Sequence, residues 1–233
     1  MIGMAGGDGS QAQVAAVASE LDLPYICVPA GTRNHFALDI GVEPGDVVGA
    51  LDAFSDGAER RIDLATVNGR VFVNNVSLGF YGRVVQSKEY RGAKFRTVIE
   101  MLPELLGPGA APFDLRFAGP DGSRYSGVQL LLVSNNRYAI DLREREGTRG
   151  GMDHGVLGVV VVTAGPPLPG VREWNTPELG VDSGTTVEAG VDGEAVTFEP
   201  PLLFASLPGA LRIRLPIRRH GHGRGRRSRV GGS

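Results

Sequence analysis

The sequence predicts an α/β plus β protein: a truncated, Rossmann-like α/β unit followed by an antiparallel β-sandwich. Three observations support this. A glycine-rich string, Gly6–Ser10, precedes a helix-like segment, and a β-type run, Tyr25–Val28, leads into a second loop. After residue 57 the chain changes to short β runs joined by turns. We therefore expect a partial α/β domain over residues 1–57, a β-sandwich over 58–217 and a basic tail over 218–233.

In the first part, capping residues and apolar spacing indicate three helices. Ser10 and Gln13 form a capping-box pair, and the apolar residues behind them recur at helical spacing. Asn34 is expected to cap a short helix that Gly41 ends. The apolar positions of the first helix are Val14, Val17, Ala18 and Leu21, and the two later helices are Phe36–Ile40 and Asp46–Phe54.

In the second part, alternation and turn residues indicate strands. Arg61–Val67 alternates, Asn68 and Gly69 form a hairpin turn, and Val71–Val76 returns as a strand. A helical pattern runs from about Val84 to Leu106. The remaining predicted strands are Phe113–Phe117, Val128–Val133, Val156–Val162, Thr186–Val191 and Leu211–Leu215.

Composition excludes several classes of protein. The chain has 233 residues, 42% of them hydrophobic and 21% charged, which is typical of a globular protein. A single cysteine, Cys27, rules out a disulfide framework, and its apolar surroundings indicate a buried, unreactive thiol. The start carries no secretion-signal pattern and no apolar run could span a bilayer, so we expect a cytoplasmic protein.

Charge is unevenly distributed along the chain. The formal net charge is −2, yet six arginines lie in the last sixteen residues, which leaves an acidic body. An acidic body argues against a nucleic-acid-binding core. The tail reads as a solvated segment without a specific partner; contact with anionic lipid or nucleic acid is the alternative.

Two loops have the composition of phosphate-binding loops. Gly6, Gly7, Asp8, Gly9 and Ser10 precede a helix whose first N–H groups have no helical partner and favour anions. Asp8 would act through Mg²⁺ or by orienting loop N–H groups. The second loop, Pro29–Asn34, contains Gly31, Thr32, Arg33 and Asn34, and Arg33 could neutralise phosphate charge. Because consecutive parallel strands end at one edge, we expect the two loops to be adjacent. An ordinary glycine turn and simple helix capping by Asn34 are the alternatives.

Two further groups of polar residues are candidates. In an extended segment Asp192 and Glu194 would project to one face, where carboxylates can hold Mg²⁺ or accept a proton; a surface turn is the alternative. Asp153 is a candidate metal ligand beside His154, which by itself reads as a loop residue. The polar residues Asp63, Asn68, Asn74 and Asn75 surround the hairpin, where they line a site or brace the fold.

In this order, the motifs resemble those of bacterial diacylglycerol kinases and, more widely, of sphingosine, ceramide and NAD kinases. Gly6–Ser10 and Pro29–Ala37 resemble the paired nucleotide loops of that family. Arg61–Gly79 resembles the first hairpin of the family's second domain. Asp192–Glu194, together with Pro208–Ile213, resembles the family's C-terminal catalytic segment. The resemblance covers residues 2 to 216.

The resemblance implies an ATP-dependent lipid kinase in which Mg²⁺ assists transfer of the γ-phosphate to a lipid hydroxyl. The two glycine loops would contact ATP, through Gly6–Ser10 on one side and Gly31, Thr32 and Asn34 on the other. Glu194 would accept the hydroxyl proton with Asp192 beside it, Asp8 would complete the catalytic set, and Asp153 would hold a structural Mg²⁺. The partner would be a lipid alcohol, reached by peripheral contact with the inner membrane face.

Four features depart from the family pattern. The segment that normally precedes the glycine-rich loop is missing, so we expect an N-terminally truncated member. Ser10 stands for the usual threonine, and His35 stands where aspartate is commoner. His154 and Gly158 stand where the metal-site segment is often rich in aspartate. A NAD-kinase-like phosphotransferase and a catalytically inactive lipid- or partner-binding fragment are the alternatives. The sequence ranks neither the lipid acceptors nor the oligomeric states.

Overall fold

The computed structural model describes residues 1–79, 112–137, 151–163 and 170–217. The helical pattern expected over 84–106 and the basic tail over 218–233 lie outside the described residues.

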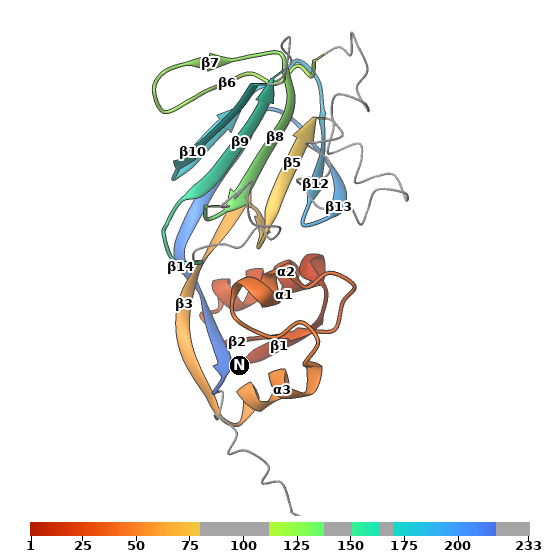
Figure 1. Cartoon of the computed structure of the whole chain (residues 1–233), viewed down its shortest axis with the longest axis vertical. Coiled ribbons are helices and arrows are strands. Elements are labelled where there is room, and N and C mark those ends of the chain that lie inside the picture. The colour runs from red at the N-terminus through yellow and green to blue at the C-terminus, as the bar shows by residue number, and fades with distance from the viewer. Residues whose placement is uncertain (80–111, 138–150, 164–169, 218–233) are drawn as a thin grey trace, which may run out of the picture.

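A six-stranded mixed sheet runs from the bottom of Figure 1 up its left side. β1 and β2 are parallel, β14 runs parallel to β2, and β3 and β4 continue the sheet in antiparallel pairing. The order is β1 (Ile2–Gly6), β2 (Tyr25–Pro29), β14 (Leu202–Pro216), β3 (Gly57–Val67) and β4 (Arg70–Phe72), and β11 (Glu178–Val181) also pairs with β14. The predicted strand at Tyr25–Val28 is confirmed.

Short helices cover both faces of the lower end of this sheet. α1 (Asp8–Glu20) and α2 (His35–Asp39) lie on the side nearer the upper sheet, and α3 (Val47–Leu51) with the 3₁₀ turn η1 (Asp52–Phe54) lies on the other (Figure 1). The helix predicted over Asp46–Phe54 is therefore confirmed as α3 and η1, with the Asp46 carboxylate accepting the Gly49 N–H at 2.8 Å.

The predicted start of the first helix is wrong, and its predicted apolar face is right only in part, since Ala18 is buried and Val14 packs against the core. α1 begins at Asp8 with Gly7 as its N-cap and no side-chain cap, so Ser10 and Gln13 form no capping box. The buried face is made by small alanines with Gln11, whereas Val17 and Leu21 are 45% and 63% exposed. The reason is packing: the side-chain amide of Gln11 donates to three main-chain oxygens of the sheet edge, which fixes that face against β1 and β2.

A second, wholly antiparallel sheet forms the upper part of Figure 1. It packs against the upper parts of β3, β4, β11 and β14 around one apolar core that is rich in valine and leucine. Its order is β10 (Gly170–Thr176), β9 (Leu157–Thr163), β8 (Val128–Asn135), β5 (Asn75–Gly79), β12 (Val187–Val191) and β13 (Glu194–Phe198), and a small hairpin pairs β6 (Phe117–Ala118) with β7 (Arg124–Tyr125).

The strand predicted over Val71–Val76 is broken in two. β4 ends at Phe72 in the first sheet, and β5 begins at Asn75 in the second. Between them the N–H groups of Val73 and Asn74 donate to the Asp192 carboxylate instead of to a neighbouring strand. A side chain from a distant hairpin therefore decides where the chain crosses between the sheets.

The first sheet draws on both of the expected domains. β1 and β2 come from residues before 57, whereas β3 begins at Gly57 and β14 comes from the end of the described chain. The structure is thus a mixed α/β fold with two main sheets and few helices, and the division at residue 57 stays a prediction.

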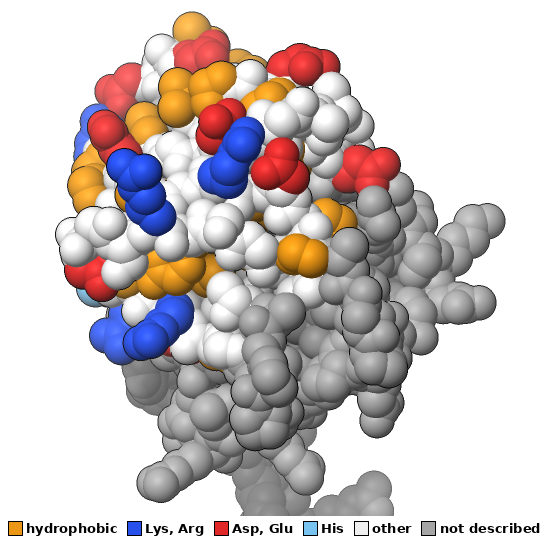
Figure 2. Space-filling view, turned by 90° about the horizontal axis from the view of Figure 1, so that it is seen from above, with side chains coloured by type: hydrophobic (Ala, Val, Ile, Leu, Met, Phe, Trp, Pro, Cys, Tyr) orange, Lys and Arg blue, Asp and Glu red, His pale blue; other side chains and the backbone are white. Residues whose placement is uncertain are grey.

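Figure 2 views the molecule from the end that carries β6 and β7. Over the described part of this face, basic and acidic side chains are intermixed. Arg116, which directly precedes β6, pairs with both Asp114 and Asp182 at 3.6 Å. Intermixed charge does not favour a nucleic-acid interface on the described part of this face.

Candidate active site

The two glycine loops touch each other, as their place after adjacent parallel strands predicted. The Asp8 N–H donates to the Arg33 carbonyl oxygen at 3.2 Å. A β-carbon built on Gly31 would lie 3.0 Å from the Gly6 carbonyl carbon and nearer still to Gly7. Because main-chain atoms cannot swing aside as a side chain can, this approach requires glycine at position 31.

Asp8 holds the second loop in place. Its side chain is 5% exposed, and it accepts the Phe36 N–H at 3.1 Å and the His35 N–H at 3.3 Å. The His35 ring adds a contact of 3.1 Å from Nδ1, and this hydrogen bond to Asp8 raises the pKa of His35 against the opposing effect of burial. Of the two roles expected for Asp8, the structure displays the orientation of loop N–H groups; its catalytic role stays a prediction.

Asn34 closes the second loop rather than capping α2. Its Oδ1 accepts the Gly31 N–H at 3.1 Å and its Nδ2 donates to the Gly31 oxygen at 2.9 Å. Asn34 occupies the N-cap position of α2, but its side chain forms no cap bond there, so the expected side-chain capping is wrong. The Asp8 carboxylate instead accepts the first N–H groups of α2, which explains why Asn34 is free for the loop. Thr32 is exposed within this loop.

Asp192 and Gly193 form a two-residue turn between β12 and β13, with φ of 47° and 86°. The expectation of an extended segment with both carboxylates on one face is therefore wrong. The Asp192 carboxylate accepts the N–H groups of Val73, Asn74 and Asn75 at 2.9, 2.8 and 3.1 Å. Desolvation raises the pKa of Asp192 to about 7, and these three N–H groups act against that rise. Asp192 therefore positions the crossing between β4 and β5.

Glu194 reaches from the upper sheet to the glycine-rich loop. A β-carbon built on Gly9 would lie 2.9 Å from the Glu194 Cδ, so the carboxylate lies directly against the first turn of α1. Its Oε2 accepts from Arg70 Nη2 at 3.1 Å, and both side chains are partly exposed. Sequence reasoning missed Arg70; the available signal was only its place directly after the Asn68–Gly69 turn, which does not point to Glu194.

Asp63 braces the junction between the sheets. Its carboxylate is 2% exposed and accepts the Gly155 N–H at 2.7 Å and the Gly209 N–H at 2.8 Å. The buried Asn135 side chain donates to the Asp63 main-chain oxygen at 3.0 Å. Asn68 plays a similar part elsewhere, since its Oδ1 accepts the Leu203 N–H at 2.7 Å. Of the two roles left open for Asp63 and Asn68, these contacts display the bracing one.

Comparison with known proteins decides the family. Residues 1–67 match the model of the diacylglycerol kinase catalytic domain. A curated protein of Pseudomonas fluorescens named "Probable lipid kinase YegS-like" is 30% identical over 242 residues, which cover 91% of this chain and 76% of that protein. The chain belongs to the bacterial diacylglycerol kinase and lipid kinase family. Its relatives support a lipid kinase role.

Further matches agree with this family. A diacylglycerol kinase of Staphylococcus aureus is 30% identical over 139 residues, or 54% of this chain and 41% of that protein. A crystal structure of a diacylglycerol kinase from Bacillus anthracis str. Sterne has a TM-score of 0.62 at 19% identity, covering 91% of this chain and 75% of that one. A second structure from the same organism reaches 0.66 at 20% identity. The structural matches establish likeness of fold.

Asp153, the expected metal ligand, has an exposed carboxylate in this chain. It follows the buried Met152. Among the described residues, no group of three or more His, Cys, Asp or Glu side chains is arranged to hold a metal ion. This donor set does not by itself make a metal site, so the ligation of Mg²⁺ by Asp153 stays a prediction.

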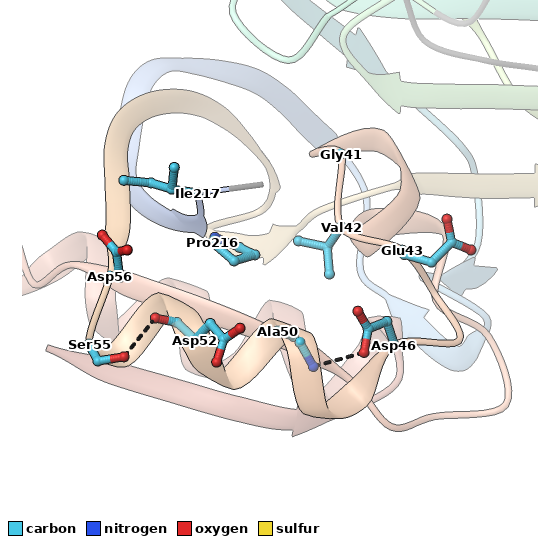
Figure 3. Close-up of a pocket in the computed structure, with 11 residues that line it drawn as sticks. Gly41, Val42, Glu43, Asp46, Ala50, Asp52, Ser55, Asp56, Pro216 and Ile217 are labelled. Atoms are coloured by element: carbon cyan, nitrogen blue, oxygen red, sulfur yellow. Dashed lines mark hydrogen bonds between the residues drawn. The ribbon is translucent and has the colours of Figure 1, made fainter. Parts of the chain in front are cut away.

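A cavity of about 510 Å³ lies away from the glycine loops, between the α2–α3 connection, α3 with η1 and the end of β14 (Figure 3). Four of its lining side chains are acidic: Glu43, Asp46, Asp52 and Asp56. Like charges in one cleft repel a polyphosphate, so this cavity is a poor place for a nucleotide.

Among the described helices, none is long and apolar enough to cross a membrane.

Buried ionisable groups near the loops are structural. Cys27 on β2 is buried, and desolvation raises the pKa of its thiol to about 12. A thiol with so high a pKa is protonated at neutral pH and unreactive. The prediction of a buried Cys27 is confirmed, and its raised pKa agrees with the expected lack of reactivity.

Proposed function

We propose that this chain is an ATP-dependent lipid kinase that transfers the γ-phosphate of MgATP to the hydroxyl of a diacylglycerol-like lipid. The observation that carries the proposal is the contact between Glu194 and Gly9. It joins the expected proton acceptor to the expected phosphate loop across more than 180 residues of sequence. The lipid kinase names of the relatives support the same reaction class.

In the proposed reaction, the lipid hydroxyl oxygen forms a bond to the γ-phosphorus while the bond from that phosphorus to the β,γ-bridging oxygen breaks. Glu194 takes the hydroxyl proton, ADP leaves with the bonding electron pair, and the product is a phosphorylated lipid. Glu194 later returns the proton to water. Such transfers depend mainly on positioning and charge stabilisation, which is what the residues around Glu194 supply.

Each nearby residue then has a defined task. The N–H groups of the N-cap Gly7 and of Gly9 and Ser10 in the first turn of α1 would face the phosphates, because the Asp8 N–H is already donated to the Arg33 oxygen. Asp8 keeps the second loop against the first, and Asp192 fixes the main chain after β4. Arg70 restrains the Glu194 carboxylate through their ion pair. Mg²⁺ would arrive with ATP as part of the substrate, where it neutralises phosphate charge.

The test is γ-phosphate transfer from MgATP to diacylglycerol, a sphingoid base, an isoprenoid alcohol and NAD. Glu194→Gln keeps the size of the side chain but cannot accept the proton, so we expect transfer to fall by about 10²–10⁴-fold. Glu178→Gln, at an exposed acidic residue on β11, is the matched control and should leave the rate unchanged.

The outcomes separate the alternatives. Transfer to a lipid that depends on Glu194 supports the proposal. Transfer to NAD alone would reassign the chain to a NAD-kinase-like activity. No transfer by folded protein to any acceptor would reject the kinase proposal in favour of a binding role.

A further inference from the structure

Arg33 lies where the two glycine loops meet the turn between β12 and β13. Its main-chain oxygen accepts the Asp8 N–H at 3.2 Å. Its guanidinium extends to the other side of the site: a β-carbon built on Gly193 would lie 3.1 Å from Arg33 Nη1. One residue therefore contacts both the phosphate loop and the hairpin that carries Glu194.

Within the part of the chain that the structure describes, the Arg33 guanidinium has neither a carboxylate partner nor a carbonyl acceptor. The carboxylates around it are engaged elsewhere: Asp8 accepts from α2, Asp192 accepts from residues 73–75, and Glu194 pairs with Arg70. Arg33 lowers the pKa of the neighbouring His35, against the larger upward effect of Asp8. Arg33 thus adds positive charge beside another basic group.

Arg33 is a residue of intermediate exposure, and its five guanidinium N–H donors have no acceptor among the described residues, which leaves them available to a ligand. Its planar fork matches two phosphate oxygens at once. The chemistry that would satisfy Arg33 is therefore a phosphate group placed between Asp8 and Gly193.

We propose that Arg33 binds the terminal phosphate of the nucleotide and stabilises the charge that develops on it during transfer. This inference rests on the proposed function. It follows from position: the loop at Asp8 would hold the nucleotide and Glu194 would hold the acceptor hydroxyl. The Arg33 main chain contacts the first, and the Arg33 guanidinium lies against Gly193, next to the second. The group that lies between nucleotide and acceptor is the phosphoryl group being transferred.

The experiment compares Arg33→Gln and Arg33→Lys with the wild-type chain. Dissociation constants for ATP and ADP are measured by calorimetry with Mg²⁺, and transfer to diacylglycerol is measured in parallel. Arg61→Gln is the matched control, because Arg61 is an exposed arginine that pairs with Asp22 at 2.8 Å.

We expect Arg33→Gln to weaken the binding of ATP at least fivefold and to leave the dissociation constant for ADP within twofold of the wild-type value. The same variant should lower kcat by about 100-fold. Arg33→Lys should restore part of kcat, because it keeps the charge but loses the two-pronged contact. A loss of general loop structure would instead weaken ATP and ADP equally.

Equal weakening of both nucleotides, or unchanged kcat with unchanged ATP affinity, would overturn the assignment of Arg33. If the wild-type chain binds ATP but transfers no phosphate, the proposed function fails while the ATP-to-ADP comparison still decides the role of Arg33. If the wild-type chain binds neither nucleotide, both proposals are rejected.

Discussion

Gly9→Ala separates the stability of the fold from its chemistry. The added methyl group would lie 2.9 Å from the Glu194 Cδ, well inside normal contact distance, so one of the two must move. The main chain of α1 is held by its helical bonds and by the sheet, whereas Glu194 is a partly exposed side chain. We therefore expect Glu194 to rotate away.

The effect on stability should be small. Rotation of Glu194 breaks its pair with Arg70, an exposed ion pair worth about 0.2–1 kcal/mol. Alanine in place of glycine in a helix stabilises by up to about 1 kcal/mol. These terms have opposite signs, so the free energy of unfolding should change by less than about 1 kcal/mol, which urea titration measures.

The effect on catalysis should be large. A displaced proton acceptor costs about 10²–10⁴-fold in kcat. The affinity for ADP shows whether the Gly6–Ser10 loop itself was damaged, and it should stay within a few-fold of the wild-type affinity. Gly45→Ala is the control, since a β-carbon there meets nothing within 4 Å. Wild-type kcat in Gly9→Ala would refute the argument that Glu194 must lie against Gly9, and so would full additivity of Gly9→Ala with Glu194→Gln.

Four further predictions follow from contacts and charges. Gly31→Ala forces two main-chain segments apart, so it should lose nucleotide binding and about 2–4 kcal/mol of stability by urea titration; a stable, nucleotide-binding variant would contradict this. Asp63→Ala leaves two buried N–H groups without their acceptor and should cost about 2–5 kcal/mol in the same assay; a cost below 1 kcal/mol would show that water replaces the carboxylate. Because the pKa of Asp192 is raised to about 7, the native state holds a proton that the unfolded chain loses near pH 4. Stability should therefore fall as pH rises from about 4 to about 7, and Asp192→Asn should remove that slope in melting curves; a slope that persists in Asp192→Asn would contradict this assignment. The pKa of His35 is raised by Asp8, so its pair stabilises the fold below about pH 6.5 and is lost as pH rises through the native pKa. His35→Gln should then destabilise by less than about 1 kcal/mol at pH 6 and not at pH 9, because the ring is 66% exposed; an equal effect at both pH values would count against the pairing.

The local signals of the chain predicted much of the fold. Turn residues and alternation placed β2, the hairpin at Asn68–Gly69, and the strands at Val128–Val133 and Thr186–Val191 within a few residues of where they lie. They failed where a distant side chain decided the outcome. The local pattern of Val71–Val76 predicts one strand, but the carboxylate of Asp192, more than 110 residues later, accepts the N–H groups of Val73 and Asn74 and divides it.

The same distinction holds for the candidate site. Sequence motifs identified both loops and Glu194, because glycine spacing and an Asp-Gly-Glu string are visible in one dimension. They could not assign Asn34 to the loop instead of the helix, nor find Arg70. Those assignments depend on which donor lies within about 3 Å of which acceptor, and that distance exists only after the chain has folded.

By itself, the sequence determined that a helix follows the first glycine loop and that a strand leads into the second. It also determined that the two loops are adjacent, and to which family the chain belongs. These follow from local backbone preference and from the rule that parallel strands end at one edge. Only the tertiary structure decided that β14 completes the first sheet, that Asp192 faces main-chain N–H groups, and that Glu194 lies against Gly9. Each of these contacts joins residues more than 100 positions apart. Their partners are selected by packing of the two sheets around a shared core, which no local pattern specifies.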